Sequence, residues 1–86
     1  MSVEIIKRKN SYQTIMKVDE EYVLISESGP ELTEGMLEHV ETLAFLCDEN
    51  GKVSNWTEVA GGTFMQISDV ITEISQYGIT KRGAYQ

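Results

Sequence analysis

The stretch LAFLCDENGKVSNW, residues 43–56, places four polar or turn-forming residues between two apolar runs. These four are Asp48, Glu49, Asn50 and Gly51. A calcium loop between two helices needs ligands at loop positions 1, 3 and 5, a glycine at position 6 and a glutamate at position 12. With Asp48 at position 1, Gly51 falls at position 4 and Val59 at position 12, and with Gly51 at position 6 the first ligand becomes Leu46. The spacing excludes this metal loop and predicts a bend.

The bend predicts a hairpin between two strands, residues 39–47 and 52–60. In one form, a type I turn is closed by Gly51 in the left-handed region, and this three-residue loop brings Ala44 near Trp56. In the other form, a two-residue Asn50-Gly51 loop brings Phe45 near Trp56. The sequence leaves the register open.

The N-terminal third predicts three strands separated by short polar turns. VEIIKRK (3–9) and YQTIMKV (12–18) are rich in β-branched and aromatic residues, and EYVLIS (21–26) follows another turn. The apolar run at 22–25 does not alternate with polar residues, which is typical of a central strand covered on both faces. Residues 31–46 have helical spacing, but we favour a short helical turn at 31–37 before the strand at 39–47, because Gly35 weakens a long helix.

A C-terminal helix over residues 64–77 is predicted from one apolar stripe at the spacing i, i+3, i+4 and i+7. The stripe consists of Ile67, Val70, Ile71 and Ile74. Thr63 with Gln66 resembles a capping box, Ser68 is the alternative cap, and Gly78 suits a left-handed C-terminal cap. The fold class is therefore α+β. We expect one domain at 1–78, with about five antiparallel strands (a three-strand meander plus a hairpin) and this helix on one face, followed by a frayed tail at 79–86.

Length and composition restrict the class of protein. The chain has 86 residues, enough for one small domain, and its 41% apolar content is that of a folded protein. No apolar run approaches the roughly 18 residues of a membrane span, and we expect no secretory signal. Cys47 is the single cysteine, so no internal disulfide can form. These features favour a cytoplasmic protein.

The net charge of −7 is concentrated in the middle of the chain. Between Asp19 and Glu49 there are ten acidic residues and no lysine or arginine. Direct binding of nucleic acid is therefore excluded, since phosphate contacts need a positive face, and a basic protein surface is the expected partner. The candidate partner-binding residues are Asp19, Glu20, Glu21, Glu31, Glu34, Glu38 and Trp56.

No pattern predicts a catalytic, metal or cofactor site, and we expect no enzyme. His39 and Cys47 would lie about 26 Å apart on an extended strand, too far for a nucleophile and its base. Gly61-Gly62 lacks the lysine and spacing of a phosphate loop, so we expect a chain reversal there. The aromatic residues are expected to fill the core, although Trp56 or Tyr22 could instead be an exposed anchor.

Residues 40–62, VETLAFLCDENGKVSNWTEVAGG, resemble small bacteriophage-encoded proteins of unknown function. The shared features are a Glu-Thr-x-x-Phe strand, an Asp-Glu-Asn-Gly turn, a strand with a tryptophan and a final helix. The resemblance implies a phage or prophage origin and brings no catalytic residues. The function we expect is an acidic protein-interaction module that binds a basic surface of a host or viral protein. The alternative is a homo-oligomeric structural or accessory protein that assembles through a sheet edge.

Overall fold

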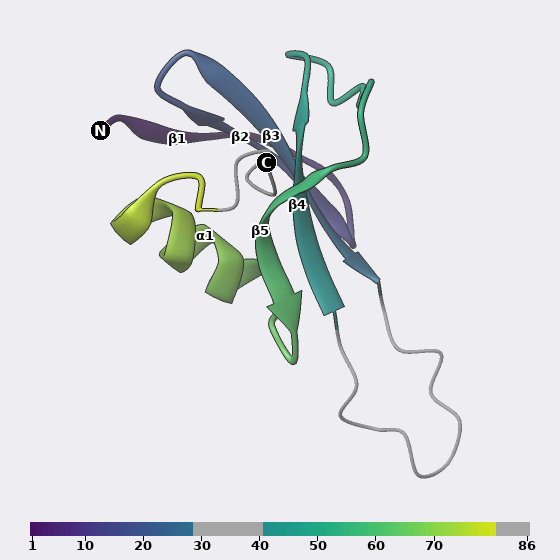
Figure 1. Cartoon of the computed structure of the whole chain (residues 1–86). Coiled ribbons are helices and arrows are strands. Elements are labelled where there is room, and N and C mark those ends of the chain that lie inside the picture. The colour runs from purple at the N-terminus through teal and green to yellow at the C-terminus, as the bar shows by residue number, and fades with distance from the viewer. Residues whose placement is uncertain (29–40, 81–86) are drawn as a thin grey trace, which may run out of the picture.

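The structure is a computed structural model that describes residues 1–28 and 41–80. These residues form a sheet with a helix on one face (Figure 1). The elements are β1 (Val3–Asn10), β2 (Gln13–Val18), β3 (Glu21–Ser28), β4 (Glu41–Cys47), β5 (Glu58–Thr63) and α1 (Ile67–Tyr77). Each strand pairs antiparallel with the next one along the chain, in the order β1-β2-β3-β4-β5. The predicted α+β class is confirmed.

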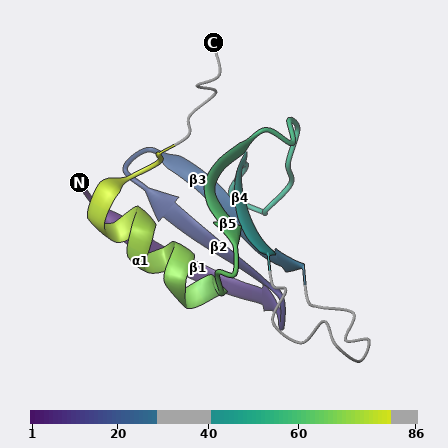
Figure 2. The same cartoon turned by 60° about the horizontal axis from the view of Figure 1, so that its bottom comes forward.

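Helix α1 lies across one face of the sheet, and the main core forms between them (Figure 2). Alternate residues of the strands point toward the helix, among them Met16 of β2 and Ile25 of β3. Val70 and Ile74 of α1 are fully buried against them, with Ile67 half-buried at the rim. The predicted apolar stripe of the helix is thus the face that packs.

The opposite face of the sheet has its own buried centre. Ile15 of β2, Leu24 of β3 and Phe45 of β4 point away from the helix and are buried. The loop at 48–57 turns back over them, and a β-carbon added to Gly51 would lie only 2.8 Å from Cδ1 of Ile15. The middle strand β3 is therefore covered on both faces, as its unbroken apolar run predicts.

The bend after β4 adopts the three-residue form. The N–H of Gly51 donates to the carbonyl oxygen of Asp48 at 3.0 Å, the N–H of Asp48 donates to that of Lys52 at 3.0 Å, and Gly51 has φ +86°. The pairing between β4 and the following chain then stops, so the predicted strand at 52–60 is wrong before Glu58, which pairs with Phe45. For the same reason the predicted approach of Trp56 to Ala44 is wrong: Ala44 pairs with Ala60, and Trp56 contacts Phe45.

Local hydrogen bonds explain why residues 52–57 leave the ladder. The Asp48 carboxylate accepts the N–H groups of Asn50 and Lys52 at 2.8 and 2.9 Å. The Asn55 side chain accepts both the N–H and the hydroxyl of Thr57, at 3.2 and 2.8 Å. Side chains of this kind offer the backbone partners that compete with a neighbouring strand. The stretch therefore becomes a loop.

Helix α1 begins three residues later than predicted. Phe64 has φ +60°, which ends the strand and delays the helix. The N-cap is Gln66, whose N–H donates to the Asp69 carboxylate at 2.9 Å, so neither Thr63 nor Ser68 is the cap. At the other end Gly78 ends the helix with φ +74° and ψ −159°, so the positive φ that favours glycine is present but the predicted left-handed helical cap is not.

The glycine pair lies inside β5, and the predicted chain reversal there is wrong. The outer edge of this strand is partly covered by later residues. The N–H of Gly61 donates to the Glu73 carboxylate at 3.1 Å, and the N–H of Thr80 donates to the carbonyl oxygen of Val59 at 3.1 Å. Ile79 packs against the core, so the tail that was predicted to fray from residue 79 is fixed in place at its first residue. Residues 81–86 and the predicted helical turn at 31–37 lie outside the described residues.

The core is aliphatic, and the expectation that aromatic residues fill it is wrong for most of them. Phe45 is buried and Tyr22 is half-buried. The other four described aromatic residues that were expected inside are exposed: Tyr12, Trp56, Phe64 and Tyr77. Three of these occupy turns or loops, and Tyr77 is the last residue of α1. Their positions in the chain, and not their hydrophobicity, determine their exposure.

Candidate functional site

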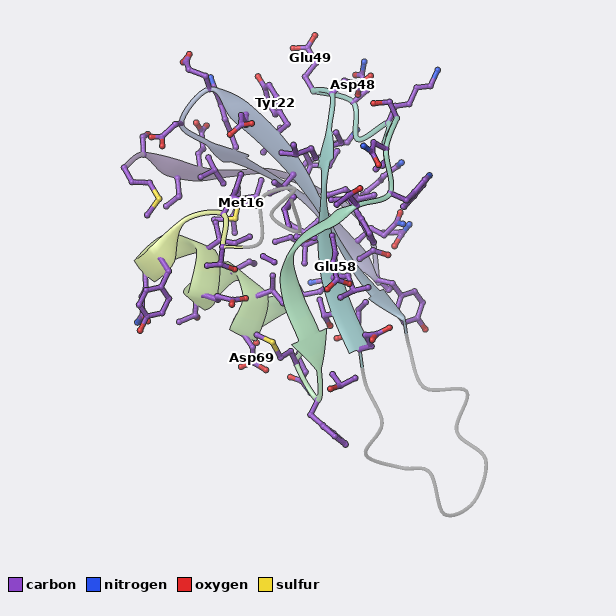
Figure 3. All side chains as sticks on the ribbon, viewed as in Figure 1. Met16, Tyr22, Asp48, Glu49, Glu58 and Asp69 are labelled. Atoms are coloured by element: carbon purple, nitrogen blue, oxygen red, sulfur yellow. The ribbon has the colours of Figure 1, made fainter. Side chains whose placement is uncertain are left out.

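Two acidic segments that are distant in sequence meet at one end of the sheet. The turn between β2 and β3 carries Asp19 and Glu20, and β4 ends just before Asp48. Tyr22 at the start of β3 pairs with Cys47 at the end of β4, so both segments extend from the same end of the sheet. Figure 3 shows Tyr22 and Asp48 at this end. We call Asp19, Glu20, Glu21, Asp48 and Glu49 the acidic end.

Backbone contacts fix the first segment of the acidic end. Asp19 has φ +54°, and its N–H donates to the carbonyl oxygen of Ser2 at 2.7 Å. The Asp19 carboxylate accepts the N–H of Ser2 at 2.8 Å. These two bonds attach the N-terminal residues to the turn, and they leave the adjacent Glu20 exposed.

The second segment is equally well defined. Hydrogen bonds from the backbone N–H groups of Lys52 and Asn50 hold the pKa of Asp48 below its usual value. The carboxylate is therefore charged at neutral pH. It shapes the turn and leaves the side chain of Glu49 exposed.

Trp56 stands on the loop that follows this turn. Its side chain is 65% exposed, yet its ring meets the buried ring of Phe45 in an edge-on contact, with centroids 5.0 Å apart and planes at 69°. Such a contact orients the indole while most of its surface stays open. Trp56 is therefore an exposed residue and not a core residue, and its role as an anchor stays a prediction.

The structure brings together part of the predicted site. Asp19, Glu20 and Glu21 are consecutive at the start of β3, whereas Trp56 lies on another loop. The other three candidates, Glu31, Glu34 and Glu38, lie outside the described residues. From the sequence, Asp48 and Glu49 count among the ten acidic residues in the middle of the chain, but not among the candidate partner-binding residues. Antiparallel pairing of the third strand with the fourth could have predicted this grouping, because it places Asp48 and Glu49 at the same end of the sheet as Asp19.

The described residues hold little that suggests chemistry. Across 1–28 and 41–80, no three His, Cys, Asp or Glu side chains are grouped so that they could hold a metal ion. Burial raises the pKa of the Cys47 thiol to about 11, helped by the nearby Asp48 charge, so the thiol is protonated at neutral pH. His39, which was predicted to lie too far from Cys47 to act as its base, lies outside the described residues.

Comparisons with known proteins add no further assignment. Within the described part of the chain, no helix has the length and apolar character that crossing a membrane requires. No protein-family model, curated protein or solved structure matches the chain. The resemblance of residues 40–62 to phage proteins therefore stays a prediction.

Proposed function

We propose that this protein is a non-enzymatic interaction module whose acidic end binds a basic surface of a partner protein. The observation that carries the proposal is the meeting of two acidic segments at one end of the sheet. Five carboxylates gather there, with Lys9, Lys17 and Lys52 near them. Lys17 lies over the Tyr22 ring, 5.6 Å from its centroid. The surface stays net negative and complements a basic one.

Trp56 supplies the apolar contact that such a surface needs. Charges at the rim of an interface steer association, whereas buried aromatic side chains contribute most of the affinity. The contact with Phe45 holds the indole in place, so burying it against a partner costs little side-chain entropy. A phage or prophage origin, with a host or viral protein as the partner, is part of this proposal.

The test starts with capture of partners by the tagged protein and release in a salt gradient. The purified partner is then titrated against a variant with Glu20→Lys and Glu49→Lys. We expect at least about tenfold weaker binding, slower association and a smaller dependence on salt, because like charges then oppose the partner. Trp56→Ala should weaken binding at every salt concentration.

The matched control reverses two carboxylates at the opposite end of the sheet, Glu27→Lys and Glu41→Lys, with the same change in net charge. This variant should keep most of the affinity. Equal loss in both double variants would mean that only the overall charge matters. Binding that is indifferent to salt and to Glu20 and Glu49 would rule out the acidic end as the contact surface.

The second candidate function is self-assembly through the edge of β1. The edge of β5 is partly covered by Glu73 and Thr80, whereas β1 carries the exposed side chains of Ile5 and Ile6. Its two register shifts and its lysines oppose edge pairing. Light scattering at increasing concentration separates the candidates. The acidic-end proposal expects a monomer, and a stable dimer that Ile6→Lys dissociates would favour self-assembly.

A further inference from the structure

A groove runs between β1 and α1, on the face of the sheet that carries the helix. Its volume is about 400 Å³, at the small end of the roughly 300–1,000 Å³ of ligand pockets. The lining residues that matter here are Ile5, Arg8, Thr14, Glu27, Ile67 and Ile71. None of them belongs to the acidic end, so the groove is a separate feature.

One part of the groove is positively charged and held in position. The Arg8 guanidinium donates from Nε to the carbonyl oxygen of Asn10 at 3.3 Å and from Nη2 to that of Ser11 at 3.2 Å. These bonds orient the group and leave its other N–H donors available. The first turn of α1 reaches the same groove through Ile67 and Ser68, whose N–H groups bond to no described residue. A helix N-terminus favours an anion.

Thr14 places a further polar group in the groove. It lies between Arg8 and Ile25 in the strand register, is only 5% exposed and lines the groove. Its hydroxyl bonds to none of the described residues, although every fully enclosed side-chain polar atom among them has a partner. The hydroxyl therefore reaches the groove. There it can donate a hydrogen bond to a ligand atom or accept one from it.

The remaining walls provide a negative charge and apolar surface. Glu27 of β3 lies on the same face as Thr14 and forms no ion pair with Arg8. The two charged residues belong to strands two apart, and Glu27 is also two residues along β3 from Ile25, the position in register with Arg8, so their Cα atoms are about 12 Å apart. Ile5 is 52% exposed beside the groove, and Ile67 and Ile71 form the helix side.

We propose that this groove binds a short zwitterionic peptide with apolar side chains. Its carboxylate binds Arg8 and the N-terminus of α1, its ammonium binds Glu27, and its peptide group satisfies the Thr14 hydroxyl. The side chains pack on the isoleucines. An inorganic anion would bind Arg8 but give the Glu27 carboxylate no cationic partner. An uncharged apolar ligand would pair with neither Arg8 nor Glu27.

The test is a titration of the full chain with L-leucyl-L-alanine, followed by amide NMR shifts. We expect saturable shifts at the N–H groups of Ile67 and Ser68, with a dissociation constant on the order of 1 mM. N-acetyl-leucyl-alanine and leucyl-alanine amide, which each lack one charge, should bind at least about fivefold more weakly. Absence of saturable shifts up to about 20 mM would overturn the proposal.

Variants that remove one charge each test which side chain binds which end of the peptide. Arg8→Gln should remove the preference for a free carboxylate, and Glu27→Gln should remove the preference for a free amine, each without affecting the other. Lys7→Gln is the matched control: it removes one positive charge from the same strand, but Lys7 pairs with Ile15, on the face away from α1. If Lys7→Gln weakens binding as much as Arg8→Gln, the groove is not the binding site. Thermal unfolding of each variant confirms that it is folded.

Discussion

Replacing Gly61 with alanine should destabilise the protein by about 3 kcal/mol or more. Gly61 has φ +98°, a backbone conformation that costs other residues roughly 1–3 kcal/mol. A β-carbon there would also collide with the carbonyl oxygen of Thr42 and lie 2.9 Å from Cα of Leu43. Both contacts are with the backbone of β4, so the strands must separate to relieve them. Urea unfolding of Gly61→Ala against the wild type measures the loss.

Gly62→Ala is the matched control on the neighbouring position. A β-carbon on Gly62 would meet only Sδ of Met65 at 3.6 Å, an ordinary van der Waals contact. We expect a change of less than about 0.5 kcal/mol, because no backbone has to move. If the two variants are equally stable, the close approach of β5 to β4 is not as described.

Ile74→Ala should cost about 3 kcal/mol and lower the melting temperature by about 15 °C. Ile74 is fully buried and belongs to the cluster that joins the helix to the sheet. Truncation removes buried methyl groups and leaves a cavity that a sheet and a single helix cannot readily close. Because a domain of this size has only about 5–15 kcal/mol of stability, the loss is a large fraction of the total.

The comparison variant is Gln76→Ala, on the same turn of α1 but exposed. It should change stability by less than about 0.5 kcal/mol, measured by the same thermal unfolding. Similar effects at both positions would contradict the packing of the helix on the sheet through Val70 and Ile74.

Residue pattern predicted most of the fold because local signals agreed with the tertiary structure. β-Branched runs separated by polar turns gave the first three strands, and the spacing of Ile67, Val70, Ile71 and Ile74 gave the packed face of α1. The prediction of a strand failed at residues 52–57, where side chains compete with the hydrogen bonds between neighbouring strands. Asp48 and Asn55 bind nearby backbone groups, and no periodicity in residues 52–57 reveals that competition.

The candidate site was less predictable, since it depends on which strand ends meet. The acidic residues were evident from composition, but their grouping required the pairing of Tyr22 with Cys47. The groove was harder still to anticipate. Arg8 and Glu27 stand on strands that are not neighbours, and Thr14 resembles any strand threonine until its burial is known.

The order of the strands has a consequence for how the chain folds. Because each strand pairs only with its sequence neighbours, the sheet can grow by successive hairpins, without bringing distant segments together first. Folding rates fall as the average sequence separation of native contacts rises, since closing a long loop costs entropy before any contact forms. Docking of α1 is a longer-range step, because the helix packs on its neighbour β5 and also on β2, β3 and β4, and Ile74 joins the cluster that contains Met16. We therefore expect the docking of the helix to follow the pairing of neighbouring strands, because its contacts with β2 span most of the described chain.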